Sequence, residues 1–304
     1  MKKSFLLAVV FPLLAIDTFK ANGASVGDPA PPVTIERWVK GAPVRIGRGT
    51  NLFVVEFWAT WCGPCKRSIP HLTALQKKYA DKGVVFIGIS DEPLTDVIPF
   101  VASQGDNMAY RVGVDTSRRT YNSWMTAYGE NGIPHAFIVN TNGIVVWHNF
   151  PNERLDSALD DLIAGRFDIQ HEKKRESGMR LIQQYTGLVS RSDAAVKAAP
   201  LGDKILSDYA VTWLIPYYLA EAILTDTAVR SRDVALALRA TTRAVEMTRH
   251  ESCDALAMHA RALYANGKKP EAVETQKQAI ALCNDPEDRA ELEKFLALFQ
   301  RGAR

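Results

Sequence analysis

Two cysteines separated by two residues constrain this chain more than any other feature of its sequence. Cys62 and Cys65 follow a buried strand expected at residues 52–57, at a point where that strand gives way to a helix. At this spacing the two sulfur atoms can bond across one helical turn, which suits reversible thiol–disulfide chemistry. The first sulfur would lie at the helix N-terminus, where unpaired backbone N–H groups and the helix dipole favour a thiolate. We therefore expect Cys62 to be the exposed nucleophile and Cys65 the buried resolving partner.

The same CxxC spacing also occurs in metal sites, so its surroundings matter. A structural zinc site needs four ligands, and the sequence has neither a second CxxC pair nor a close pair of histidines. We interpret four histidines as ordinary because they form no ligand spacing: His71, His148, His250 and His259. We therefore expect no metal and no cofactor, with an inert buried cysteine pair as the lesser alternative.

The motif at residues 58–66, Trp-Ala-Thr-Trp-Cys-Gly-Pro-Cys-Lys, resembles the thioredoxin active site. Two further segments, Val-Gly-Asp-Pro-Ala-Pro at 26–31 and Gly-Ile-Pro at 132–134, are similar to the extracytoplasmic, TlpA/ResA-like branch of the thioredoxin superfamily. The resemblance covers residues 26–166. It implies an α/β thioredoxin fold, a central mixed sheet flanked by helices, with an added N-terminal hairpin and a βα insertion after the CxxC helix.

The resemblance also implies a substrate groove beside the cysteines. In that family the proline matching Pro134 is cis and faces the cysteines. The residues expected to contact substrate are then Trp61, Gly63, Pro64, Ile133 and Pro134. Trp61 is a candidate for an exposed contact, because an aromatic ring offers a large apolar surface with a polar edge.

The pattern of apolar residues predicts strands alternating with helices, which indicates a mostly parallel sheet. A β-hairpin is expected within residues 26–49, at the sheet edge. The expected strands are 52–57, 84–89, 110–114, 136–139 and 144–147, and the expected helices are 63–80, 95–103, 117–128 and 153–164. An Asn-Gly turn at 142–143 joins the last two strands.

The length of 304 residues allows two domains of ordinary size. We divide the chain into a signal peptide at 1–24, a redox domain at 25–166, a linker and helical connection at 167–206, and a helical domain at 207–304. The charge cluster at residues 171–176 is interpreted as a solvated linker or frayed helix, with a binding patch as the alternative. The net charge of +3 is small and scattered, so nucleic acid is not expected as a partner.

The C-terminal residues resemble a tetratricopeptide-like helical domain. Small and apolar residues at 255–282 are similar to one such repeat, with a fainter copy at 234–244. Asp285 and Pro286 are typical of the N-cap and first turn of a terminal helix. All-α structure is therefore expected for this part, and a protein partner could bind the repeat.

The N-terminus predicts export. Lys2 and Lys3 precede an apolar run at residues 5–16, which is too short to span a membrane comfortably. We expect cleavage, with an uncleaved anchor as the alternative, and a periplasmic or otherwise extracytoplasmic location. In an oxidising compartment Cys253 and Cys283 are candidates for a structural disulfide, and two free buried thiols are the alternative.

Two further residues are candidates for the redox site. Glu56 precedes Cys62 by six residues on the strand that leads to the motif, where thioredoxins carry a buried acid. Burial would raise its pKa and leave a carboxyl able to exchange a proton with Cys65; the alternative is a glutamate facing solvent. The lysine partner of that acid in thioredoxin is not evident, since Gly88 falls at its position. His135 follows Pro134 and is expected either to border the groove or to be an ordinary surface histidine.

These features predict a thiol–disulfide oxidoreductase that acts on disulfide-containing proteins. Gly63, Pro64 and Ile133 resemble reducing thioredoxins more than the oxidising branch, and no basic side chain lies between Cys62 and Cys65 to hold a very acidic thiolate. A reductant outside the cytoplasm needs electrons from a membrane-embedded thiol donor. The alternatives are a partner-binding helical-repeat protein with an auxiliary redox domain, a disulfide donor, and a peroxidase.

Overall fold

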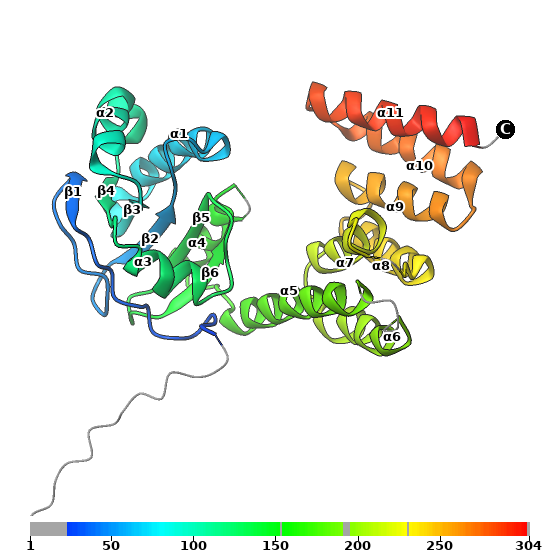
Figure 1. The fold of residues 1–304 in the computed structure, drawn as a ribbon, viewed down its shortest axis with the longest axis horizontal. Coiled ribbons are helices and arrows are strands. Elements are labelled where there is room, and N and C mark those ends of the chain that lie inside the picture. The colour runs from blue at the N-terminus through cyan, green and yellow to red at the C-terminus, as the bar shows by residue number, and fades with distance from the viewer. Residues whose placement is uncertain (1–22, 153, 191–194, 230, 303–304) are drawn as a thin grey trace, which may run out of the picture.

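A computed structural model describes residues 23–152, 154–190, 195–229 and 231–302. Figure 1 shows a sheet with its flanking helices on the left and a stack of helices on the right, with helix α5 between them. The expected signal peptide falls almost entirely on residues 1–22, outside the described residues. Within the described part, no helix is long and apolar enough to cross a membrane.

Six strands form one mixed sheet in the order β1-β4-β3-β2-β5-β6. The strands are β1 (Arg37–Lys40), β2 (Leu52–Phe57), β3 (Val84–Ser90), β4 (Arg111–Val114), β5 (His135–Val139) and β6 (Val145–Asn149). Strands β2, β3 and β4 run parallel, whereas β1, β5 and β6 each pair antiparallel with their neighbours. The central strand β2 alternates its side chains between two buried faces, and this places Glu56 on the opposite face from Phe57.

Helices cover one face of the sheet, and a short helix with the N-terminal segment covers the other. The first face packs against α1 (Gly63–Lys78), α2 (Leu94–Gln104) and α4 (Leu155–Ile163). On the second face lie α3 (Arg119–Tyr121), the π-helical turn Asn122–Thr126 and the segment 24–35. Short 3₁₀ helices at Ala80–Lys82 and Gly105–Met108 follow α1 and α2. Glu56 therefore lies on the face that α1 covers.

The N-terminal segment differs from the expected β-hairpin. Within residues 26–49 the one regular strand is β1, which pairs with β4 at the sheet edge, and Pro29 forms an isolated bridge with Ile144. Prolines at 29, 31, 32 and 43 lack the N–H group that a ladder needs. The segment instead packs apolar side chains, Val33 and Ile35 among them, over the sheet.

The helices that follow α4 begin at residue 169, within the segment 167–206 that was expected to be a linker and helical connection. The helices are α5 (Ile169–Val189), α6 (Ala195–Lys204), α7 (Leu214–Thr225), α8 (Val234–Met247), α9 (Cys253–Ala265), α10 (Lys269–Leu282) and α11 (Pro286–Gly302), with a π-helical turn at Ile205–Tyr209. Side chains at Asp168, Asp233 and Ser252 accept backbone N–H groups at the starts of α5, α8 and α9. Helices α6 and α7 both pack against α5, and from α7 to α11 each helix packs against the next one up the stack (Figure 1). The predicted connection at 167–206 is thus part of this helical domain.

Three residues of the charge cluster at 171–176 are buried in helix α5, which corrects its interpretation as a solvated linker. Glu172, Arg175 and Glu176 lie on the face of α5 that meets the redox domain. Glu172 forms ion pairs with Arg175 at 2.7 Å and with Arg154 at 3.1 Å. The guanidinium of Arg175 also donates to the carbonyl oxygen of His148 at 3.0 Å. Buried charges need such partners, and the redox domain supplies them.

Candidate active site

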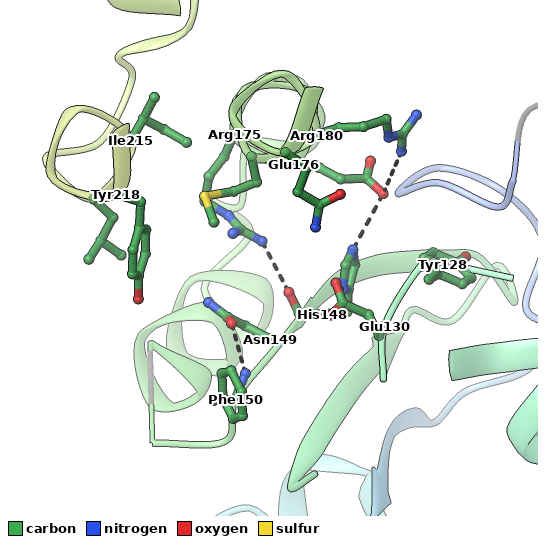
Figure 2. Close-up of a pocket in the computed structure, with 13 residues that line it drawn as sticks. Tyr128, Glu130, His148, Asn149, Phe150, Arg175, Glu176, Arg180, Ile215 and Tyr218 are labelled. Carbon is green, nitrogen blue, oxygen red and sulfur yellow. Dashed lines mark hydrogen bonds and ion pairs between the residues drawn. The ribbon is translucent and has the colours of Figure 1, made fainter. Parts of the chain in front are cut away.

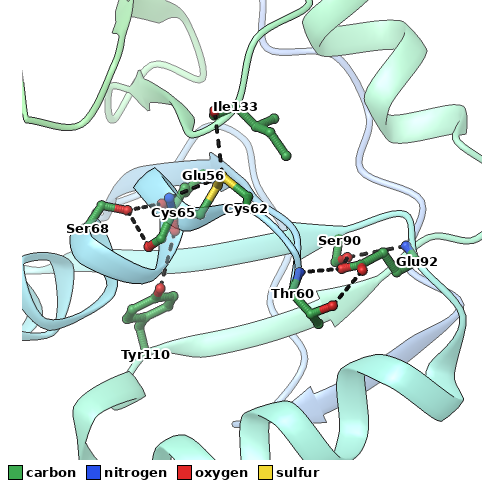
Figure 3. The surroundings of a disulfide bond; sticks show 9 residues. All are labelled: Glu56, Thr60, Cys62, Cys65, Ser68, Ser90, Glu92, Tyr110 and Ile133. Carbon is green, nitrogen blue, oxygen red and sulfur yellow. Dashed lines mark hydrogen bonds between the residues drawn. A yellow bond between two sulfur atoms is a disulfide. The ribbon is translucent and has the colours of Figure 1, made fainter.

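The two cysteines lie at the N-terminus of α1, at the C-terminal end of β2 (Figure 3). The structure holds them as a disulfide, with their Cα atoms 5.2 Å apart. Cys62 is the N-cap residue of α1, and its sulfur accepts the backbone N–H of Cys65 at 3.1 Å. Only 3% of the Cys62 surface is exposed in this state, and Cys65 is fully buried. Cys62 is thus the more accessible of the two, although it is less open than expected.

The loop before Cys62 is held by the carboxylate of Glu92, which follows strand β3. Both the backbone N–H and the hydroxyl of Thr60 donate to Glu92, at 2.6 and 2.7 Å, and the hydroxyl of Ser90 donates to the same carboxylate at 3.0 Å. Beside this loop Trp61 is 71% exposed, whereas Trp58 is buried beneath the site. Trp61 is therefore placed where a substrate could contact its ring.

A proline loop lies against the disulfide. The Ile133–Pro134 peptide bond is cis, as the resemblance implies, and Cys62 Sγ lies 3.7 Å from the carbonyl oxygen of Ile133. Pro134 is buried, Ile133 is half-buried, and Gly63 and Pro64 are exposed. The structure thus brings the predicted groove residues to one end of the sheet, around the two sulfurs.

Glu56 lies buried beneath α1, only 1% exposed. The pKa of its carboxyl is raised from 4.5 to about 8, because the effect of burial outweighs the hydrogen bonds from Ser68 and Tyr110, which lower it. Ser68 lies 3.0 Å from one carboxyl oxygen and Tyr110 lies 3.2 Å from the other. At neutral pH the carboxyl is therefore mostly protonated, which a solvent-facing glutamate would not be.

Ser68 joins Glu56 to the resolving cysteine. Its hydroxyl lies 2.9 Å from the carbonyl oxygen of Cys65 and 3.0 Å from Glu56 (Figure 3). A hydroxyl carries one proton, so it cannot donate to both. When Glu56 is ionised, Ser68 donates to it and lowers its pKa; when Glu56 is protonated, its O–H can donate to Ser68 while Ser68 donates to the carbonyl oxygen of Cys65. The neutral carboxyl thus completes a hydrogen-bonded chain that ends at the backbone of Cys65.

Tyr110 and Ser68 are the site residues that the sequence reasoning missed. Gly88 lies beside Glu56 in the β2–β3 register, and a Cβ atom there would come within 3.0 Å of both Trp58 Nε1 and Tyr110 Cε2. The absence of a side chain at Gly88 therefore makes room for the Tyr110 ring. The sequence did contain one indication of this neighbour: Gly88 stands where a lysine was expected, so another residue had to contact Glu56.

His135 does not border the groove, which corrects the prediction for this residue. It is 2% exposed, and Nε2 of its ring lies 3.1 Å from Nδ1 of His148. Burial, followed by the nearby charges of His148 and Arg175, lowers the pKa of His135 well below 6.5. Its position in β5, opposite Phe57, turns it toward the second face of the sheet and away from the cysteines. Among the described residues, Glu130, His135 and His148 form the one group that could hold a metal ion.

Cys253 and Cys283 are free thiols in the structure. Cys253 is half-buried at the start of α9, and Cys283 is buried just after α10. Burial, together with the neighbouring Asp254 and Cys283, raises the pKa of the Cys253 thiol to about 12. The two side chains are neighbours, and a bond between them stays a prediction.

The fold and the site together define a thioredoxin-like domain with a CxxC redox pair, followed by a helical domain. Residues 26–148 match the AhpC/TSA family. The chain is 30% identical to the thiol-disulfide oxidoreductase ResA of Geobacillus kaustophilus over 127 residues, which are 41% of this chain and 68% of that protein. The chain therefore belongs to the thioredoxin-like AhpC/TSA family, alongside the ResA thiol-disulfide oxidoreductases.

Other similarities cover the same part of the chain. Protein FixW of Rhizobium leguminosarum is 29% identical over 135 residues, 42% of this chain and 61% of FixW. The chain spans less than two thirds of the length of FixW and of several ResA relatives. A thiol:disulfide interchange protein DsbE structure from Chlorobium tepidum is 23% identical, covers 46% of this chain and 98% of its own, and has a TM-score of 0.37.

Proposed function

We propose that this protein is an extracytoplasmic thiol–disulfide oxidoreductase that reduces protein disulfides. The observation that carries the proposal is the Cys62–Cys65 pair at the start of α1, with the Ile133–Pro134 loop beside it and Glu56 beneath it. The extracytoplasmic location rests on Lys2, Lys3 and the apolar run that follows them.

The reaction begins from the reduced pair. The Cys62 thiolate, favoured by the N-terminus of α1, attacks one sulfur of the substrate disulfide. The substrate S–S bond breaks, a Cys62–substrate mixed disulfide forms, and the departing thiolate takes up a proton. The backbone beside Ile133 and Pro134 offers an extended substrate segment a place to bind as an added strand. Trp61, Gly63 and Pro64 form the exposed surface around the attacking sulfur.

The second step uses Cys65 and Glu56. In the molecules in which Glu56 is ionised, the thiol of Cys65 loses its proton to the Glu56 carboxylate, and its sulfur then attacks Cys62. The mixed disulfide breaks, the Cys62–Cys65 bond forms, and the reduced substrate leaves with both electrons. A carboxyl with a pKa of about 8 is suited to this task, because a general base works best when its pKa lies near the operating pH.

The direction of the reaction is part of the proposal. A strong oxidant needs a very stable thiolate, and no lysine, arginine or histidine lies between Cys62 and Cys65 to stabilise one. The oxidised pair must then be reduced again by a membrane-embedded thiol donor. The helical domain at residues 169–302 offers a separate surface on which a protein partner could bind, as the tetratricopeptide resemblance suggests.

Trapping experiments test the roles of the two cysteines. Cys65→Ser should accumulate mixed disulfides with substrate proteins, because the second attack is lost, whereas Cys62→Ser should form none and should have no reductase activity. Non-reducing gels and mass spectrometry of the captured species measure this. Trapping by Cys62→Ser and not by Cys65→Ser would reverse the assignment. Peroxide consumption by the wild-type protein, measured alongside, would instead favour a peroxidase.

A further inference from the structure

We infer that Glu130, His135 and His148 form a binding site for a zinc ion, or for a divalent ion with the same ligand preference, on the face of the sheet opposite α1. One ligand atom from each residue can be chosen so that all three lie within 4.8 Å of one another. The site joins the proline loop, strand β6 and helix α5. It is separate from the cysteines and from the proposed reductase reaction.

The distances between the ligand atoms suit a tetrahedral ion. His135 Nε2 lies 3.1 Å from His148 Nδ1, and His148 Nδ1 lies 3.5 Å from Glu130 Oε1. Zinc binds imidazole and carboxylate at about 2.0–2.2 Å, which places neighbouring ligand atoms roughly 3.3–3.5 Å apart in a tetrahedron. Two of the three ligand pairs thus lie close to this spacing, and the remaining pair, His135 and Glu130, lies within 4.8 Å and would have to approach to share one ion. Two histidines and one glutamate form a known zinc ligand set that leaves the fourth position to water.

A second carboxylate fixes the orientation of His148. Glu176 on α5 lies 3.3 Å from His148 Nε2 (Figure 2), and it is held by Arg180 at 3.4 Å and by the backbone N–H of Val26 at 3.1 Å. With Nε2–H donating to Glu176, the lone pair on His148 Nδ1 points toward His135. Metal-bound histidines in proteins almost always donate their other ring N–H to such a partner.

The hydrogen bonding of the histidine pair is incomplete without an ion. His148 Nδ1 is then an acceptor, so His135 must carry its proton on Nε2 and donate it to His148. The other ring nitrogen of His135, Nδ1, is left unprotonated with its own lone pair. Within the described residues that nitrogen is buried and has no hydrogen-bond partner; Glu130 Oε2 lies 3.8 Å away. With the ion on Nε2, the proton moves to Nδ1, where it faces that carboxylate oxygen. Oε2 would have to move closer to accept this N–H as a hydrogen bond, so binding of the ion together with a shift of Glu130 would give the unpartnered nitrogen a partner.

The site also has access to solvent. Glu130 is 31% exposed and lines a cavity of about 230 Å³ together with His148, Glu176 and Tyr218. An ion can enter from this cavity, and water can occupy the fourth position. Because Glu130 and His135 flank the Ile133–Pro134 peptide, the bound ion would tie both ends of the proline loop to β6.

Zinc binding to the full-length protein tests the inference. The protein is used with Cys62 and Cys65 oxidised, so that their sulfurs cannot compete, and zinc is titrated against a chromophoric chelator. The wild type should bind one equivalent. His135→Gln should abolish this binding, and Glu176→Gln should weaken it about 10- to 100-fold, as expected for a residue that orients a ligand. His71→Gln is the matched control, because His71 on α1 also faces a carboxylate, Asp156, but lies outside the site.

Two further measurements separate the site from other causes. Cobalt in place of zinc should give the visible bands of a tetrahedral ion without a near-ultraviolet thiolate band, which excludes Cys253 and Cys283 as ligands. X-ray absorption at the zinc edge of the wild type should show imidazole scattering and no sulfur, and this holds even if a histidine variant fails to fold. Absence of zinc binding, equal binding by wild type and a folded His135→Gln, or a sulfur shell would each overturn the inference. None of these results depends on reductase activity.

Discussion

Replacing the buried acid gives the sharpest test of the proposed proton relay. The Glu56 pKa is about 8 in the folded protein and near 4.5 when the chain unfolds. Between these two values the folded state holds a proton that the unfolded state has released, so stability falls as pH rises. The contribution of the neutral carboxyl is fully present below pH 4.5 and is lost as pH approaches 8. Glu56→Gln cannot ionise and removes this dependence.

The size of the effect follows from the pKa difference. Each unit of difference corresponds to about 1.4 kcal/mol, so the whole shift amounts to about 5 kcal/mol of unfolding free energy. Between pH 5 and pH 8 the wild type should lose about 4 kcal/mol relative to Glu56→Gln. Near pH 5 the variant should be similar to the wild type or slightly less stable, because the amide must replace the carboxyl in its contacts with Ser68 and Tyr110. Near pH 8 the variant should be the more stable protein.

Urea unfolding of the oxidised protein at several pH values between 5 and 8 measures this difference. Five of the six tryptophans lie within residues 25–166, so their fluorescence reports mainly on the redox domain. Asp106→Asn, an exposed acid in the same domain, is the matched control. Its stability should run parallel to that of the wild type at every pH.

Parallel curves for Glu56→Gln and the wild type would refute the reasoning. They would mean that Glu56 has the same proton in the folded and unfolded protein, and the carboxyl would then have no raised pKa to use as a relay. If the stability curves diverge as predicted, rapid-mixing kinetics complete the test. Glu56→Gln should slow the attack of Cys65 on the mixed disulfide near neutral pH and leave the first attack nearly unchanged.

Three further predictions address neighbouring features. Tyr110→Phe removes a hydrogen bond that lowers the Glu56 pKa, so the pH profile of the second attack should move to higher pH; an unmoved profile would show that the bond has no influence. The potential of the Cys62/Cys65 pair, measured in a glutathione or dithiothreitol buffer, should lie near the roughly −270 mV of thioredoxin, whereas a value near roughly −120 mV would make the protein a disulfide donor. Alkylation of the unfolded, unreduced protein followed by intact-mass analysis should leave Cys253 and Cys283 unlabelled if they are bonded, and this bond would stabilise the fold by about 3–4 kcal/mol; labelling of both excludes it.

The sequence predicts the parts of the site that depend on local spacing. The CxxC pair, the strand before it and the helix after it lie within a few residues of one another, so turn, cap and periodicity rules describe them. The burial of Glu56 was expected from the family resemblance, with a solvent-facing glutamate as the alternative, because alternation along β2 determines only the face on which it lies. The cis peptide at Ile133–Pro134 came from the family resemblance alone, because spacing carries no information on peptide geometry.

The partners of Glu56 could not be predicted in the same way. Tyr110 is 54 residues away from Glu56 along the chain, and it arrives through the register of β4 against β3. A one-residue change of that register would turn Tyr110 to the other face. The contact between Tyr110 and Glu56 therefore depends on how the strands pair in the sheet. In the sequence, only Gly88 indicated that there is space beside Glu56 for another side chain.

Helix α5 shows the same limit at the level of domains. In the sequence its charged residues look solvated, because several of their partners lie far away along the chain, in the redox domain. Glu176 receives the backbone N–H of Val26, 150 residues away, and Arg175 reaches the carbonyl of His148. Cutting the chain before α5 would leave these redox-domain groups without their partners. The boundary predicted near residue 166 therefore marks the change from an α/β to an all-α pattern in the sequence. It does not separate the interactions, because groups of the redox domain form hydrogen bonds and ion pairs with α5.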